Sequence, residues 1–79
     1  MATKEIETAP GATGCLARAA DNEPLFILRA KDLLAPLAVR DWAKRADAAG
    51  VSQEKIAEAL SLAREMEAWQ EIYGKKVPD

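Results

Sequence analysis

The stretch Arg29-Ala30-Lys31-Asp32 holds the side chains best suited to binding a charged ligand. An arginine guanidinium can hold a phosphate group through two parallel hydrogen bonds, and the nearby lysine adds a second positive charge. The aspartate could orient the arginine or accept a hydrogen bond from a ribose hydroxyl, and tryptophan rings elsewhere in the chain could stack on a base. The candidate ligand-binding residues are therefore Arg29, Lys31, Asp32, Arg40, Trp42 and Trp69.

The same residues also have a purely structural interpretation. Arg29 and Asp32 can pair with each other, and both tryptophans can belong to the hydrophobic core. Residue types and their spacing leave the two interpretations open, so the positions of these side chains in the fold must decide between them.

Residues on which many enzymes rely are missing from this chain or stand in unsuitable surroundings. There is no histidine, which excludes a Ser-His-Asp or Cys-His arrangement. The single cysteine, Cys15, lies in an apolar stretch without a base, and we expect it to be a buried small hydrophobe. The pairs Glu54–Glu58 and Glu67–Glu71 fit a solvated helix face better than an acid–base pair. We therefore predict a protein that is not an enzyme, with no catalytic residue, no cofactor and no metal site.

The elements that must position the candidate residues begin with three weakly marked segments. Residues 1–12 should form a flexible tail, or an arm that becomes ordered on a partner, because they hold one large aliphatic residue and a Pro-Gly pair. Residues 13–20 should form a short helix capped by Thr13. Residues 23–32 contain the apolar run Leu25–Leu28, for which we favour a short helix over an edge strand that pairs with a second copy.

The stronger helix signals lie in the second half of the chain. Residues 35–50 have Pro36 in the expected first turn, apolar residues at steps of three and four, and a closing glycine. In residues 51–73, Ser52 is the predicted capping residue, and Gly74 follows the segment. Val51 before the cap and Ile56 in the first turns have the spacing of a hydrophobic staple. Because the link between these two segments is very short, we expect them to pack as an antiparallel hairpin.

The predicted fold class is all-α: a small helical domain over residues 13–74, in which short helices pack on the C-terminal hairpin, followed by a tail over residues 75–79. A chain this short buries only about 60% of the surface that its unfolded form exposes. The core of such a chain contributes no more than about 3–5 kcal/mol to the free energy of unfolding. The last helix carries an apolar stripe at coiled-coil spacing, which is either a generous internal core or an interface between copies. We favour a homo-oligomer with the interface residues Leu62, Met66, Trp69 and Tyr73.

Composition and charge narrow the classes of partner. The 79 residues are 49% apolar and 30% charged, as in soluble globular proteins. No apolar run is long enough for a membrane span and no secretory leader is recognisable, which predicts a cytoplasmic protein. A net charge of −2 argues against DNA binding. The last predicted helix, however, holds five glutamates and two basic residues, so it could bind a basic partner protein.

The chain also carries several motifs in a fixed order. The segment from Asp21 to Asp32 reads DNEPLFILRAKD; it is followed by Ala35-Pro36, by Arg40 and Trp42, and by Met66-Glu67-Ala68-Trp69. These motifs resemble those of a group of short bacteriophage accessory proteins. The resemblance covers roughly residues 14–69.

This resemblance implies a class of function rather than the roles of single residues. Small, non-catalytic phage accessory proteins often inhibit host machinery or host immunity, and one recurring design is a homo-oligomer whose subunit interfaces bury a nucleotide signal. Such signals include cyclic dinucleotides and cyclic ADP-ribose-type molecules made by host defence systems. The resemblance therefore implies a phage-encoded binding protein of the host cytosol that counters host defence by sequestering such a signal. The alternative is an inhibitor or adaptor that blocks a host protein through its acidic helix.

Overall fold

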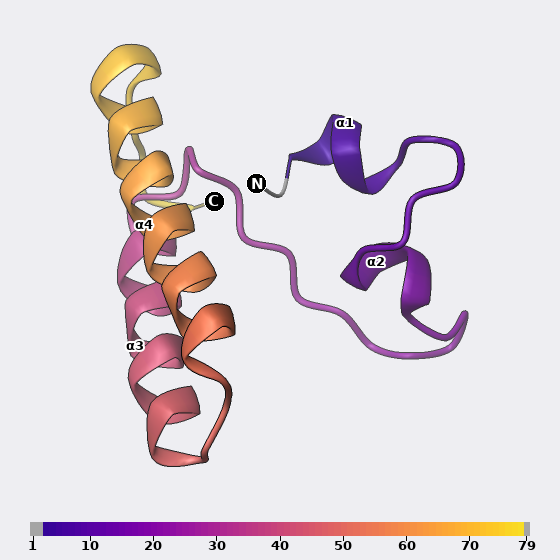
Figure 1. Ribbon diagram of the computed structural model, residues 1–79. Helices are drawn as coiled ribbons and strands as arrows, with labels where there is room; N and C mark the ends of the chain where they lie inside the picture. The colour runs from indigo at the N-terminus through magenta and orange to yellow at the C-terminus, as the bar shows by residue number, and fades with distance from the viewer. Residues whose placement is uncertain (1–2, 79) are drawn as a thin grey trace.

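The computed structural model describes residues 3–78, and these are mostly helical (Figure 1). The helices are α1 (Lys4–Glu7), α2 (Cys15–Arg18), α3 (Ala35–Ala48) and α4 (Gln53–Tyr73). Helices α3 and α4 pack side by side and run antiparallel, whereas α1 and α2 lie apart from them beyond an extended segment. No β-strand occurs in the described residues, and the predicted helical class and C-terminal hairpin are confirmed.

Helix α3 begins and ends close to where the local signals of the sequence predict. Pro36 lies in its first turn, where the missing N–H removes no hydrogen bond. The helix ends at Ala48, and Gly50 then adopts a positive φ of 84°, a conformation that glycine reaches without a steric penalty. The amide of Val51 donates to the carbonyl oxygen of Ala46 at 3.0 Å, which closes the link to α4.

Helix α4 has a side-chain cap at its first turn. The Ser52 hydroxyl oxygen accepts a hydrogen bond from the Lys55 amide at 3.3 Å, so the predicted cap is confirmed. At the other end Gly74 takes a φ of 93°, and its amide donates to the carbonyl oxygen of Gln70 at 2.8 Å. The predicted end of the helix before Gly74 is therefore also confirmed.

Removing the cap of α4 should destabilise the hairpin measurably. We expect Ser52→Ala to lower the free energy of unfolding by about 1 kcal/mol, because an amide of the first turn loses its acceptor. Urea denaturation followed by circular dichroism measures this change. The matched control is Thr3→Ala: Thr3 caps α1 in the same way, by accepting from the Ile6 amide, and α1 does not contact α3 or α4. An equal loss of unfolding free energy in both variants would contradict the role of Ser52 as the cap that stabilises the hairpin.

The core lies between α3 and α4 and consists largely of alanine. Its buried apolar residues are Ala35, Ala43, Ala46, Ile56, Ala63 and Met66. Val51, which precedes α4, packs against the cluster that contains Ile56, as the predicted hydrophobic staple requires. Since alanine side chains are short, the two helices can approach closely, and the packed interior leaves little room for larger side chains.

The N-terminal half differs from the predicted arrangement. Helices α1 and α2 contact each other, but within residues 3–78 neither contacts α3 or α4, so the prediction that short helices pack on the hairpin is wrong. The reason is that a single helical turn such as α2 offers too little apolar surface to hold it against the hairpin. The predicted cap of this helix is also wrong: α2 begins at Cys15, so Gly14 rather than Thr13 is its N-cap residue.

The run Leu25–Leu28 forms an extended segment rather than the short helix that we favoured, so that prediction is wrong. Phe26 and Ile27 are 87% and 73% exposed. Four consecutive apolar residues have no polar face, and so short a helix is not stable without a surface on which to pack. The conformation of this run therefore depends on what covers it.

Both segments that were expected to be tails contain ordered contacts. Residues 1–12 include α1, capped by Thr3, while residues 1 and 2 lie outside the described part of the chain. In residues 75–79, Lys76 forms a parallel bridge with Asp32, while Asp79 lies outside the described residues. The bridge matters for function because it brings the C-terminal segment next to the predicted ligand residues.

Candidate functional site

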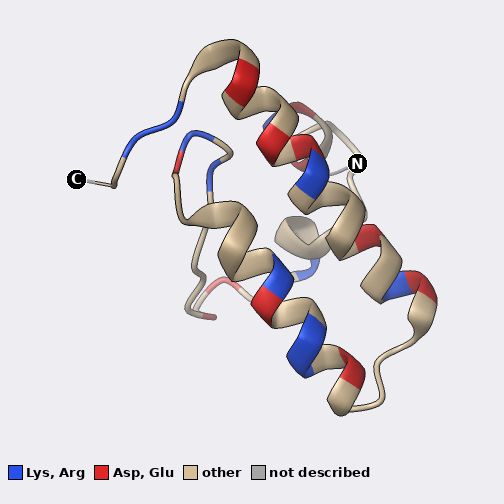
Figure 2. Cartoon of the chain, turned by 90° about the vertical axis from the view of Figure 1, so that its left-hand side faces the viewer, with Lys and Arg blue, Asp and Glu red and all other residues tan. Residues whose placement is uncertain are grey.

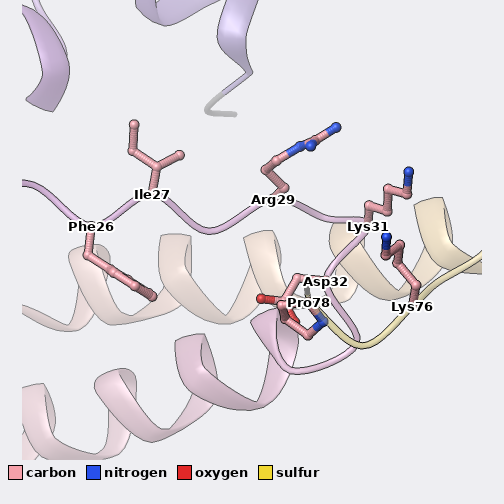
Figure 3. A pocket seen from close by; sticks show the side chains of 7 residues that line it. All are labelled: Phe26, Ile27, Arg29, Lys31, Asp32, Lys76 and Pro78. Carbon is pink, nitrogen blue, oxygen red and sulfur yellow. The ribbon is translucent and has the colours of Figure 1, made fainter.

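The candidate site is a hollow between the extended segment before α3 and the C-terminal segment after α4 (Figure 3). We call it the basic hollow; it is lined by Phe26, Ile27, Arg29, Lys31, Asp32, Lys76 and Pro78. The side chains of Arg29 and Lys31 extend away from α3, and Lys76 lies beside Lys31 (Figure 3). The structure thus brings together three of the predicted ligand residues and adds a third cation from the end of the chain.

Two backbone hydrogen bonds hold the two segments together. The Lys76 amide donates to the carbonyl oxygen of Lys31 at 3.0 Å, and the Leu33 amide donates to the carbonyl oxygen of Lys76 at 2.9 Å. Together they make the parallel bridge between the segment that precedes α3 and the segment that follows α4. Lys76 was not among the predicted site residues, because the sequence carries no local signal for a pairing between such distant segments.

A buried glutamine holds the extended segment against α4. Gln70 is 8% exposed, and its Nε2 donates to the carbonyl oxygens of Ala30 at 2.9 Å and Asp32 at 3.0 Å. These two carbonyls flank Lys31, so the glutamine fixes the backbone on both sides of that cation. Leaving a buried polar group of this kind without a partner costs about 1–3 kcal/mol.

The basic hollow carries an excess of positive charge. Among the described residues, the side chains of Arg29 and Lys31 have no ion pair. Asp32 is the one acidic residue of the lining, and its Oδ1 accepts a hydrogen bond from the Leu34 amide at 2.7 Å. The alternative in which Arg29 pairs with Asp32 is therefore not what the described residues show. A hollow lined by three cationic side chains and one carboxylate attracts anions.

Two arginines of the helix pair, in contrast, have carboxylate partners. Arg40 on α3 forms an ion pair with Glu67 on α4 through Nη2 and Oε1, and it does not line the basic hollow. The Nε of Arg45 donates to Oδ2 of Asp41 at 2.9 Å. That hydrogen bond, and then the attraction of the carboxylate charge, raise the pKa of the Arg45 guanidinium above its ordinary value. Arg40 and Arg45 thus have carboxylate partners on the helix pair, whereas Arg29 and Lys31 have no ion pair among the described residues.

The two tryptophans lie outside the basic hollow and outside the core. Trp42 on α3 and Trp69 on α4 are both partly exposed. Trp69 stacks against Tyr73, with ring centroids 4.8 Å apart and ring planes tilted by 38°. The aromatic ring at the hollow belongs instead to Phe26, whose place in an apolar run gave no sign of this position.

The predicted interface residues divide between the inside and the outside of the hairpin. Met66 belongs to the core, Leu62 is half-buried, and Trp69 and Tyr73 are exposed near the end of α4. Met66 is therefore not available to a second copy. Further large apolar side chains are exposed before and along α3, namely Leu25, Phe26, Ile27, Leu33, Leu34, Leu37 and Trp42.

Cys15 is exposed on α2, so the prediction that it is a buried hydrophobe is wrong. The reason is that α2 packs only against α1 in the part of the chain that the structure describes. Across residues 3–78 no three side chains of the types that bind metals come together to hold an ion. No helix in that range is both long and apolar enough to cross a membrane.

The chemistry of the site follows from its residues. Cations and an exposed aromatic ring line one open hollow, an arrangement that suits a phosphate-bearing ligand with a flat ring. No protein-family model matches the chain, and no curated protein or solved structure matches it at a significant level. The residues of the hollow therefore carry the functional argument.

Proposed function

We propose that this protein binds a phosphate-bearing nucleotide in the basic hollow and sequesters it as a homo-oligomer. The observation that carries this proposal is the meeting of Arg29, Lys31 and Lys76 at one hollow, with the exposed Phe26 at its opposite end (Figure 3). Phosphate oxygens accept charge-assisted hydrogen bonds from arginine and lysine, and a base can stack on an aromatic ring. The proposed role is binding alone, without catalysis and without a cofactor.

Oligomer formation would cover apolar side chains that a single chain leaves exposed. Leu25, Phe26 and Ile27 precede Arg29 on the extended segment and are all exposed. Covering them with a second copy would stabilise the assembly by about 25 cal/mol for each Å² of apolar surface removed from water. It would also turn an open hollow into an enclosed site, so ligand binding and assembly would support each other.

The class of ligand that we propose follows from the resemblance to bacteriophage accessory proteins. It is a cyclic dinucleotide or a cyclic ADP-ribose-type molecule made by a host defence system. A protein that sequesters such a signal lowers its free concentration in the host cytosol in proportion to the number of binding sites. This function requires tight binding but no turnover.

A ligand-shift experiment tests the proposed function. We expect a cyclic dinucleotide or an ADP-ribose derivative, at about 100 times its Kd, to stabilise the protein by about 2.7 kcal/mol, because the ligand binds only the folded state. Thermal unfolding with and without ligand gives the shift in Tm, and sedimentation of the same samples gives the mass of the assembly. No shift with a panel of such nucleotides at millimolar concentration, or a monomer at every concentration, would contradict the proposal.

The acidic-helix alternative has less support. In that function the glutamates of α4 bind a basic host protein, and acidic residues do occur along the whole length of α4 (Figure 2). Helical spacing divides them, however, with Glu54, Glu58 and Glu65 on one side and Glu67 and Glu71 on another. One of them, Glu67, already pairs with Arg40. Because this alternative predicts no nucleotide-induced shift in Tm, the same experiment distinguishes the two functions.

A further inference from the structure

We infer that Gln70 is a positioning residue that sets the spacing of the cations in the basic hollow. The part of this inference that concerns ligand affinity rests on the proposed function. Gln70 is the one polar residue that is buried among the described residues. Its amide group has two N–H donors, and the two hydrogen bonds from Nε2 go to the carbonyl oxygens of Ala30 and Asp32.

Gln70 connects α4 with the two segments that line the hollow. Its side chain holds the carbonyls on both sides of Lys31, and the Lys31 carbonyl oxygen accepts the Lys76 amide at 3.0 Å. The backbone carbonyl oxygen of Gln70 accepts a hydrogen bond from the Gly74 amide at 2.8 Å, where the chain leaves α4 toward Lys76. One residue therefore orients the extended segment and also takes part in the turn that returns the C-terminal segment to it.

The cations depend on this residue because their segment has no regular structure of its own. Arg29 and Lys31 lie on extended chain, and their side chains extend away from α3 (Figure 3). Without the bonds from Gln70, the backbone around Lys31 would be held mainly by its bridge to Lys76, and the separation between the cations would vary. A ligand with more than one phosphate oxygen binds best to cations that are already held at the right spacing. Gln70 thus controls affinity without touching the ligand.

The test compares Gln70→Met with Gln53→Met. Both substitutions remove a side-chain amide from α4 at nearly unchanged size, but Gln53 donates only to Oδ1 of Asp47, at the opposite end of the helix. We expect Gln70→Met to weaken the binding of pyrophosphate about tenfold, with an unchanged helical circular dichroism spectrum, and Gln53→Met to leave binding unchanged. Gln70→Asn keeps the amide, but its side chain is too short to reach both carbonyl oxygens. It replaces Gln70→Met in the same binding measurement if the methionine variant does not fold.

Hydrogen exchange provides a readout that does not depend on a ligand. The amides of Leu33 and Lys76 both donate across the bridge, and in Gln70→Met we expect them to exchange about tenfold faster while the amides within α3 stay protected. Unchanged exchange at Leu33 and Lys76, or faster exchange with unchanged pyrophosphate affinity, would overturn the inference. If the unsubstituted protein binds no pyrophosphate while the variant exchanges faster, the proposed function fails and the positioning role of Gln70 is supported.

Discussion

Replacing Arg29 and Lys31 together with alanine is expected to weaken nucleotide binding by about a hundredfold or more, since a hydrogen bond to a charged group contributes about 1.5–3 kcal/mol. Neither side chain has an ion pair among the described residues, so their removal leaves no internal carboxylate without its partner. Both are exposed and lie outside the core, so the fold should be retained. Isothermal titration calorimetry with the nucleotide that gives the largest shift in Tm measures the change.

The matched control for this variant is Lys55→Ala combined with Arg64→Ala. It changes the net charge by the same amount, and both residues are exposed on α4 and do not line the basic hollow. Only the long-range attraction for an anion is altered, and salt screens that attraction, so we expect a change in affinity of less than about threefold. If this control loses as much affinity as the Arg29 and Lys31 variant, the ligand binds somewhere other than the basic hollow.

The largest effect on folding is expected from Ala63→Leu. Ala63 is 0% exposed on α4, so the larger side chain has no free space to enter and must push its neighbours apart. Such overpacking costs about 1–3 kcal/mol or more, whereas a single chain of this size has only about 3–5 kcal/mol of stability in total. We therefore expect a much lower urea midpoint, or an unfolded protein under native conditions.

Ala57→Leu controls for the substitution itself. Ala57 lies on the same helix but is exposed, and leucine is nearly as good a helix former as alanine. The free energy of unfolding should therefore change by no more than about 0.5 kcal/mol. A similar large loss at both positions would mean that α4 itself, rather than its packing against α3, is disturbed.

The helix pair was predictable from the sequence because its signals act locally. Pro36, Gly50, Ser52 and Gly74 each favour or end a helix through their own backbone or through a neighbour within a few residues. The run Leu25–Leu28 is different, since an apolar run takes its conformation from the surface that covers it, and periodicity does not reveal that surface. For the same reason the separation of α1 and α2 from the hairpin was not predictable.

The candidate site was predictable only where its residues are neighbours in sequence. Arg29, Lys31 and Asp32 stay together in the basic hollow because they share one short segment. Lys76 enters through a bridge between distant segments, which no local pattern predicts. Gln70 did leave a signal: it follows Met66 by one helical turn, so it is a polar residue at a position of the apolar stripe.

The bridge between Asp32 and Lys76 also joins the extended segment before α3 to the C-terminal segment after α4. The bridge thereby closes the helix pair at the end opposite the Gly50 turn. The segment before α3 and the segment after α4 cannot separate without loss of the hydrogen bond from the Leu33 amide to the Lys76 carbonyl oxygen. A ligand that binds both Lys31 and Lys76 would add a second link between these two segments. Ligand binding would then slow the local unfolding of α3 and α4 together, and local unfolding of this end would favour ligand dissociation.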